Sequence, residues 1–206
     1  MFTEPTLNKS FLNNLRGIFS LASDSDKIEG LKWYQDAHDF CASLALETGY
    51  SLEQVIGVVS ALSPSNYWEQ NKKAARILCV AVRQGQDLPY CYTYTFNRDK
   101  AVKILEGSLN TLEIDVILNS PKTRSFFWNI LQPDLGHAVT VDGHMGHAAV
   151  DGVRKGISQF KKSLTPRLYS EIQEAITALA SEYGFAPCQM QAILWLTYRK
   201  LEFKKA

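Results

Sequence analysis

The sequence predicts an all-α fold, because helical periodicity and helix-capping patterns recur along nearly the whole chain. Ser51 and Gln54 have the spacing of a capping box, and Thr165-Pro166 places a capping side chain just before a proline at the first helical position. No alternation of apolar and polar residues continues long enough to indicate a strand. We therefore expect about ten short helices.

The expected helices are bounded by such caps and by glycine or proline. A stripe of apolar residues within 33–45 indicates one helix, which stops at Gly49. Asn97 is expected to cap a helix over 98–106. Pro89 and alternating tyrosines indicate a loop or a short extended piece over 87–96. The remaining helices are expected over 52–62, 67–82, 112–118, 122–131, from 143 onward, over 167–183 and from 187 to about 203.

The composition indicates a globular protein with a substantial core. Of the 206 residues, 46% are hydrophobic and 21% are charged, which excludes a disordered or fibrous chain. The length suits one domain, or one domain made of two tightly packed lobes. The net charge of +1 gives no global attraction to nucleic acid or membrane, so a local patch must hold any polyanion.

Neither a membrane span nor a secretion signal is expected. No apolar run approaches the roughly 18 residues that a membrane helix needs. The N-terminal residues show no basic stretch followed by an apolar run. We therefore expect a cytoplasmic protein.

The four cysteines are far apart in the sequence. Cys41, Cys79, Cys91 and Cys188 are each more than ten residues from the next. This spacing excludes C-x-x-C zinc sites and the short loops that hold iron–sulfur clusters. Buried free thiols are expected instead.

The densest polar cluster lies at residues 138–147. A short apolar extended piece leads to Asp142, and small residues follow it, so that another group can approach the backbone closely. Asp142 has two interpretations. It is either a helix N-cap, which contributes about 1 kcal/mol, or a functional carboxylate at the start of a helix.

A second cluster, at residues 119–128, combines cations with polar and aromatic side chains, among them Thr123 and Trp128. Lys122 and Arg124 fall in the first turn of a helix, where the macrodipole disfavours positive charge. The free amides of that turn, together with Lys122, suit a phosphate or another anion. The alternative is that both cationic side chains extend into solvent.

Polar and aromatic residues also crowd an expected turn between two helices at residues 63–71. The members of this third cluster are Ser65, Asn66, Tyr67, Trp68 and Asn71. The aromatic rings either stack on nucleobases or belong to the core.

A basic run lies near the last third of the chain. Its members are Arg154, Lys155, Lys161, Lys162 and Arg167, and no acidic residue lies between positions 151 and 171. Such a run either follows a phosphate backbone or forms a solvated face.

Taken in order, these segments resemble the helix-hairpin-helix DNA glycosylase superfamily. Residues 55–63 and 71–74 are similar to an early helix–turn–helix of that family. Lys122-Thr123 matches the end of its hairpin, and residues 141–145 match its Val-Asp-x-His signature, which is the most specific part. The resemblance spans residues 50–200. It is closer to divergent phage-type members than to housekeeping repair enzymes.

The resemblance implies a two-lobed, helical DNA-glycosylase-like fold with an interlobe cleft. One lobe would comprise residues 51–135, including the hairpin, and the other residues 1–50 together with 136–206. Asp142 would be the catalytic aspartate. Lys122 would be the lysine that attacks the sugar in lyase-competent members.

The chemistry is consistent with these roles. Breaking an N-glycosidic bond builds positive charge on the sugar, which a carboxylate such as Asp142 stabilises while it orients or deprotonates a water. An amine such as Lys122 instead forms a Schiff base. The base must leave the duplex, and Tyr67, Trp68 and Trp128 would receive it.

The hairpin departs from the family pattern. Asn119-Ser120-Pro121 replaces the usual Gly-x-Gly turn whose amides grip phosphate, and the position of the family's wedge residue falls near Pro64. The iron–sulfur cysteines of some members are absent, so we expect no cluster and no other cofactor.

We expect a DNA N-glycosylase that excises a damaged or modified base, with phage DNA among its substrates. The DNA would be double- or single-stranded, the protein a monomer, and no membrane would take part. One alternative is a base-hypermodification transferase, in which an amine displaces pyrophosphate from a modified pyrimidine while Lys122 and Arg124 hold the pyrophosphate. Another is a non-catalytic DNA-binding module.

The histidines leave two interpretations open. His144 either contacts a phosphate or packs at the seam between the lobes. We expect no metal site, but a metal hydrolase remains an alternative in which His137, Asp142, His144 and His147 surround a metal ion.

Overall fold

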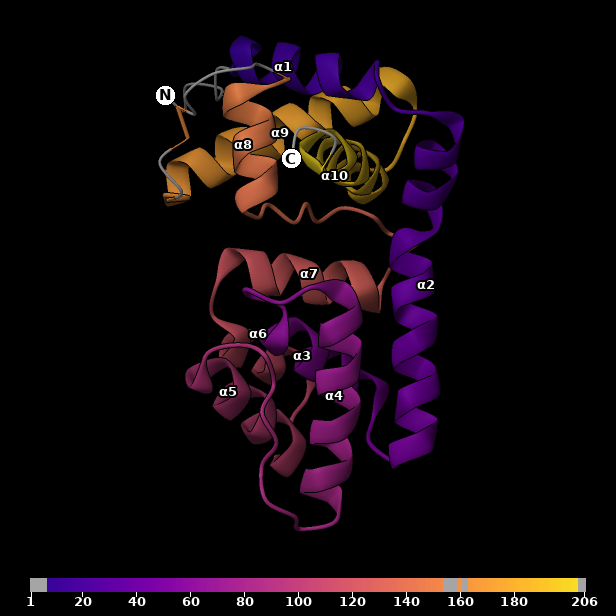
Figure 1. Ribbon diagram of the computed structural model, residues 1–206, viewed down its shortest axis with the longest axis vertical. Coiled ribbons are helices and arrows are strands. Elements are labelled where there is room, and N and C mark those ends of the chain that lie inside the picture. The colour runs from indigo at the N-terminus through magenta and orange to yellow at the C-terminus, as the bar shows by residue number, and fades with distance from the viewer. Residues whose placement is uncertain (1–6, 154–158, 161–162, 204–206) are drawn as a thin grey trace. The chain divides into compact units, whose positions relative to one another are not determined.

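The computed structural model describes residues 7–153, 159–160 and 163–203 (Figure 1). Within these ranges the chain forms ten helices and no strand, which confirms the all-α class. No helix among them is both long enough and apolar enough to cross a membrane. The helices are α1 (Lys9–Phe19), α2 (Asp24–Thr48), α3 (Leu52–Leu62), α4 (Trp68–Arg83), α5 (Thr95–Glu106), α6 (Thr111–Leu118), α7 (Pro121–Leu131), α8 (Gly143–Asp151), α9 (Pro166–Tyr183) and α10 (Pro187–Phe203).

The chain divides into two compact units. The first unit combines Met1–Tyr34 with Asp134–Ala206, and the second is Gln35–Pro133. The boundary lies inside α2, whereas the sequence placed it after residue 50. The second half of α2 belongs to the second unit because Phe40 packs against Trp68 there, and Glu47 pairs with Arg76.

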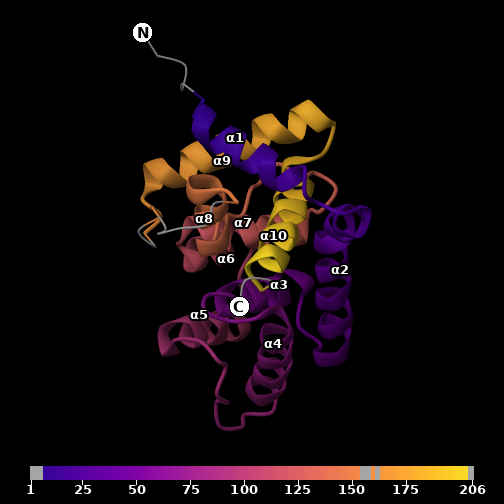
Figure 2. The same ribbon diagram turned by 45° about the horizontal axis from the view of Figure 1, so that its top comes forward.

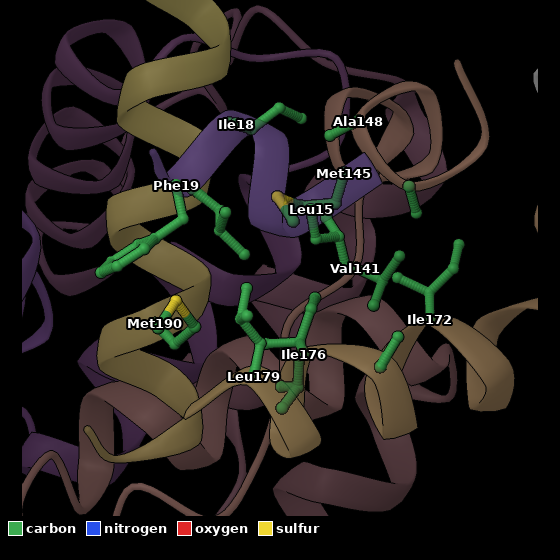
Figure 3. Packing of buried hydrophobic residues seen from close by; sticks show 14 of the residues in the cluster. Leu15, Ile18, Phe19, Val141, Met145, Ala148, Ile172, Ile176, Leu179 and Met190 are labelled. Carbon is green, nitrogen blue, oxygen red and sulfur yellow. The ribbon is translucent and has the colours of Figure 1, made fainter. Parts of the chain in front are cut away.

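The first unit is built around a core that four helices share. α1 packs against α8, α9 and α10 (Figure 1). Figure 3 shows apolar side chains from these helices meeting in one cluster, with Leu15 and Ile18 from α1, Met145 from α8 and Ile176 from α9 fully buried. Burial of each such side chain stabilises the fold by roughly 1.5–3 kcal/mol. This core fixes the start of α8, and with it Asp142.

The close approach expected after Asp142 is made by an aromatic ring of the same unit. A Cβ added at Gly146 would lie 2.4 Å from the Cζ of Phe160. Only glycine leaves room for that ring against the backbone of α8. The small residue here therefore serves packing within the first unit.

The second unit is organised around α3. This helix packs against α4, α5, α6 and α7, and every residue from Val55 to Leu62 is buried (Figure 2). The Ser51–Gln54 capping box is present as expected. The side-chain amide of Gln54 also donates to the carbonyl of Ile104 at 3.0 Å, so the same cap ties α3 to α5.

The expected helix caps are confirmed at three further positions. Ser120, Asp142 and Thr165 each accept a hydrogen bond from the backbone N–H three residues later. The cap expected at Asn97 is wrong. α5 begins at Thr95, and the amide of Asn97 is buried and donates to the hydroxyl of Thr93 at 2.9 Å. Asn97 therefore lies inside the first turn of α5, and Tyr94 occupies the N-cap.

All four cysteines are buried and free, as expected. Burial raises the pKa of the Cys41 and Cys79 thiols to about 12 and that of the Cys188 thiol to about 11. Thiolate formation is therefore suppressed at neutral pH.

Candidate functional site

Asp142 lies at the start of α8, at the end of a buried extended segment. The hydroxyl of Tyr169 holds that segment: it donates to the carbonyl of Val139 and accepts the backbone N–H of Val141, both at 3.1 Å. A second α9 side chain, Gln173, donates to the same Val139 carbonyl at 2.9 Å. α9 thus fixes the point at which Asp142 leaves the core.

Each carboxylate oxygen of Asp142 accepts one hydrogen bond. Oδ1 accepts the backbone N–H of Met145 at 2.9 Å, and Oδ2 accepts the indole N–H of Trp195 at 3.0 Å. The first bond is the N-cap, so the capping interpretation is confirmed. The second bond comes from α10, so the carboxylate does more than cap its own helix.

The charge of Asp142 is not neutralised by an ion pair in the described part of the chain. Its side chain is half-buried, and the N-terminus of α8 favours the negative charge. The result is a carboxylate that is fixed in orientation, partly open to solvent and not paired with a cation from any residue that the structure describes.

Trp195 was not singled out by the sequence analysis. The Arg199 guanidinium lies 4.7 Å from the centroid of the Trp195 ring. Trp33 contacts the same ring edge to face, with the two ring centroids 6.1 Å apart. The spacing of Trp195 and Arg199, one helical turn apart, is the signal that could have indicated this pair.

The two histidines of α8 have partners within the first unit. His144 Nδ1 lies 2.9 Å from the Glu202 carboxylate, and His147 Nδ1 lies 3.0 Å from the Asp151 carboxylate. No group of three His, Cys, Asp or Glu side chains in the described ranges is placed to hold a metal ion. His144 is thus engaged with an acidic partner on α10.

Lys122 lies in the first turn of α7, which Ser120 caps. Its amine is 3.5 Å from the backbone carbonyl of Ser63, the C-cap residue of α3. The C-terminus of a helix favours a cation. The unfavourable position of Lys122 in its own helix is therefore offset by the end of α3.

Arg124 and Trp128 share a buried partner, Asp115 of α6. Arg124 Nε donates to Oδ2 of Asp115 and the indole N–H of Trp128 donates to Oδ1, both at 2.9 Å. The side chain of Asp115 is 7% exposed, so an unpaired charge there would be costly. Asp115 accounts for the cation at position 124, for which the sequence left two interpretations, an external anion or extension into solvent.

Two of the expected DNA contacts are buried instead. The hydroxyl of Thr123 donates to the carbonyl of Leu118 at 2.9 Å, and the amide of Asn71 donates to the carbonyl of Val59 at 2.9 Å. Neither side chain reaches the surface. Their expected role as direct contacts is corrected: they join helices within the second unit.

The other members of the third cluster lie in the turn between α3 and α4 or at the start of α4. Ser65 is exposed and has a φ of 57°, and Tyr67 is exposed at the N-cap of α4. Trp68 is half-buried and makes edge contacts with Phe40 and Phe126. Tyr67 is thus available at the surface, while Trp68 packs into the unit.

Buried polar atoms without a partner gather at the same turn. They are the hydroxyls of Ser60 and Ser63 and the amide oxygens of Asn66 and Asn71, as counted over the described residues. Each such group costs about 1–3 kcal/mol when left unsatisfied, and such groups are rare in native structures. The Lys122 amine lies beside the same turn, 3.5 Å from the Ser63 carbonyl. The turn therefore combines a cation with several buried polar atoms that have no partner among the described residues. Ser63 lies within the third cluster predicted from the sequence, whereas Ser60 was not predicted as a site residue.

Comparison with known proteins identifies the family. A family model described as a family of unknown function, DUF7178, matches residues 2–202. The chain belongs to the DUF7178 family. No curated protein matches the chain, and no solved structure matches it.

The DUF7178 match covers both groups of candidate residues. Asp142 and His144 belong to the first unit, whereas Lys122 and the turn at 63–71 belong to the second. A shallow pocket in the second unit, lined by Leu88, Val102 and Lys103 among others, contains none of the predicted site residues. The candidate chemistry of this DUF7178 protein therefore rests on side-chain geometry within each unit.

Proposed function

We propose that this DUF7178 protein is a DNA N-glycosylase, which releases a damaged or modified base by cleaving its N-glycosidic bond. The observation that carries the proposal is the carboxylate of Asp142. It is half-buried, fixed by hydrogen bonds from α8 and α10, and unpaired with any cation in the described residues. The resemblance of residues 141–145 to the glycosylase signature supports the same role.

A fixed carboxylate suits the charge that develops in this reaction. As the base leaves, positive charge builds on the sugar, and a negative group held beneath it stabilises that charge without having to reorient. The N–H donors of Met145 and Trp195 prevent the carboxylate from rotating away. The carboxylate also orients the water that replaces the base.

Lys122 is the second residue in the proposal. Its amine would either contact a DNA phosphate or, once deprotonated, attack the sugar C1′ as the base departs with the electrons of the N-glycosidic bond. The sugar ring then opens: the C1′–O4′ bond breaks, O4′ takes its electron pair and a proton, and the nitrogen loses a proton, which leaves a Schiff base at C1′. Replacement of Lys122 by alanine should then abolish strand nicking while base release continues. Nicking by the Lys122→Ala variant at the wild-type rate would exclude the nucleophilic role.

The proposal also covers how the protein binds DNA, where in the cell it acts and whether it acts as a monomer. A net charge of +1 supports binding of a short stretch of DNA by local patches rather than by a global field. Four buried free cysteines suit a reducing compartment, so we place the protein in the cytoplasm. We propose that it acts as a monomer.

The test compares wild-type protein with Asp142→Asn on a panel of natural and hypermodified DNAs. Asparagine is also a good N-cap, so this variant should fold, but it loses the negative charge and its single side-chain oxygen can no longer accept both N–H groups as the carboxylate does. Mass spectrometry should detect free base and abasic sites with the wild type and none with Asp142→Asn. Asp134→Asn, an exposed carboxylate of the same unit, is the matched control and should retain activity.

Two results would contradict the proposed glycosylase activity. Full activity of Asp142→Asn would remove the carboxylate from the mechanism. A new covalent adduct on the base, without free base, would instead show the transferase reaction.

A further inference from the structure

Four exposed aromatic side chains alternate along residues 90–96 of the second unit. We call Tyr90, Tyr92, Tyr94 and Phe96 the aromatic strip; their side chains are 73%, 43%, 59% and 57% exposed. Two of the three residues between them face inward, since Cys91 is buried and Thr93 is hydrogen-bonded to the body of the unit, whereas Thr95 is exposed. Large exposed apolar patches on a folded protein commonly mark binding sites.

The aromatic strip is anchored to the turn between α3 and α4. The hydroxyl of Thr93 donates to the carbonyl of Pro64 at 2.7 Å, and the amide of Asn66 donates to the carbonyl of Cys91 at 3.2 Å. Between these two bonds, Tyr92 is held at a φ of 57°, which L residues rarely adopt. The strip is therefore a fixed surface, joined to the turn that carries the exposed Tyr67.

The rings of the strip are arranged in pairs. Tyr94 and Phe96 are stacked, with centroids 5.6 Å apart and planes 8° from parallel. Tyr90 and Tyr92 meet edge to face at 5.0 Å. Apart from Thr95, the exposed side chains of this segment are aromatic, so the surface offers flat ring faces rather than aliphatic bulk.

The charge beside the strip favours an anionic partner. The Lys100 amine lies 5.7 Å from the Phe96 centroid and donates to the Asn119 side chain at 2.8 Å. Tyr94 occupies the N-cap of α5 without a side-chain cap, and the first turn of that helix has no acidic residue. The carboxylate of Asp99, one turn on, is 3.6 Å from Arg98. Positive potential thus borders the rings.

We propose that the aromatic strip binds single-stranded DNA by stacking on unpaired bases, with the adjacent phosphates held by Lys100 and the start of α5. Aromatic rings stack on the bases of a nucleic acid, and cations bind its phosphates. A duplex hides its base faces in its own stack, so the unpaired strand is the partner that these rings can reach. The inference rests on the proposed function for DNA as the substrate, and it specifies DNA with an unpaired segment beside the target base.

The test measures binding rather than base release. Fluorescence anisotropy of a labelled oligothymidylate, and of a duplex of equal length, is recorded with the full-length protein and with two double variants. Tyr90→Phe with Tyr94→Phe keeps the rings, whereas Tyr90→Leu with Tyr94→Leu keeps apolar bulk without them. Tyr183→Leu, an exposed tyrosine of the first unit, is the control.

Stacking predicts that the phenylalanine pair and the control bind the oligothymidylate as the wild type does. The leucine pair should bind at least tenfold more weakly, and the wild type should prefer the single strand to the duplex. Circular dichroism must show that the leucine pair is folded. If the folded leucine pair binds as tightly as the wild type, or if the wild type prefers the duplex, the inference is wrong.

A further arm separates this inference from the proposed function. Asp142→Asn should still bind the oligothymidylate, because Asp142 lies outside the strip. If the wild type binds the oligothymidylate tightly but releases no base, the strip binds single-stranded DNA as proposed and the proposed glycosylase activity is wrong. Concentration-dependent self-association that the leucine pair abolishes, with no DNA binding by the wild type, would assign the strip to a second copy of the chain and overturn the inference.

Discussion

Asp115 and Asp142 show how the same side chain serves two purposes in one chain. Both accept a tryptophan indole N–H. Asp115 is buried and also pairs with Arg124, so its charge is consumed within the second unit. Asp142 is half-buried and lacks such a cation among the described residues, so its charge remains available to a substrate. The two carboxylates therefore differ in their neighbours, and we propose a catalytic role for Asp142 alone.

At the same scale, the cysteines should be unreactive in the folded protein. Burial raises the pKa of the Cys41, Cys79 and Cys188 thiols, and Cys91 shares this direction. We expect a disulfide reagent such as DTNB to modify none of the four rapidly under native conditions and all four in guanidinium. Rapid release of even one equivalent from native protein would contradict this expectation.

At the scale of elements, close helix packing depends on glycine at a few positions. A Cβ added at Gly30 of α2 would lie 2.8 Å from the backbone of Ile193 in α10, which cannot move aside easily. Gly17 of α1 has no atom within 4 Å of such a Cβ. Gly17 and Gly30 therefore allow a controlled comparison within the first unit, because only Gly30 lacks room for a Cβ.

Alanine at these positions should have opposite effects on stability. Gly30→Ala should lower the free energy of unfolding by about 1–3 kcal/mol through overpacking. Gly17→Ala should raise it by about 0.5–1 kcal/mol, because alanine favours the helix. Urea unfolding followed by circular dichroism measures both. Equal effects of the two substitutions would show that α2 and α10 do not pack as described.

The elements were predictable from the sequence where local contacts decide them. Ser120, Asp142 and Thr165 cap their helices through bonds that span three residues; the caps at Ser120 and Thr165 were predicted, and a cap was one of two interpretations of Asp142. The cap predicted at Asn97 is wrong because α5 begins two residues earlier, at Thr95, so a local pattern misplaced the start of this helix. The bond between Asp142 and Trp195 spans 53 residues, so no local pattern could indicate it.

At the scale of the whole molecule, the chain passes between the two units twice, once within α2 and once between Pro133 and Asp134. Within the first unit, Lys200 of α10 contacts Asp26 of α2, and it also lies 3.3 Å from Glu29. Burial disfavours the ionised form of Asp26, but the hydrogen bonds from Lys200 and Ser23 outweigh it and lower the pKa of this carboxyl. The interaction thus links the stability of this unit to pH.

The pH dependence has a definite sign. Because the folded pKa of Asp26 is lowered, its contribution is present above the unfolded pKa of about 3.9 and is lost as pH falls through the folded value. Lys200→Met should therefore be less stable than the wild type at pH 7, and the difference should shrink below pH 4. Thermal unfolding at several pH values measures it. A difference that is constant from pH 7 to pH 2 would rule out this linkage.

The account as a whole depends on the charge of Asp142. The most direct measurement is the single-turnover rate of base release from one DNA substrate by wild type and by folded Asp142→Asn. The account predicts a rate at least about 100-fold lower for the variant, as expected when a preorganised charge is removed from a transition state. Equal rates for the two proteins would contradict it.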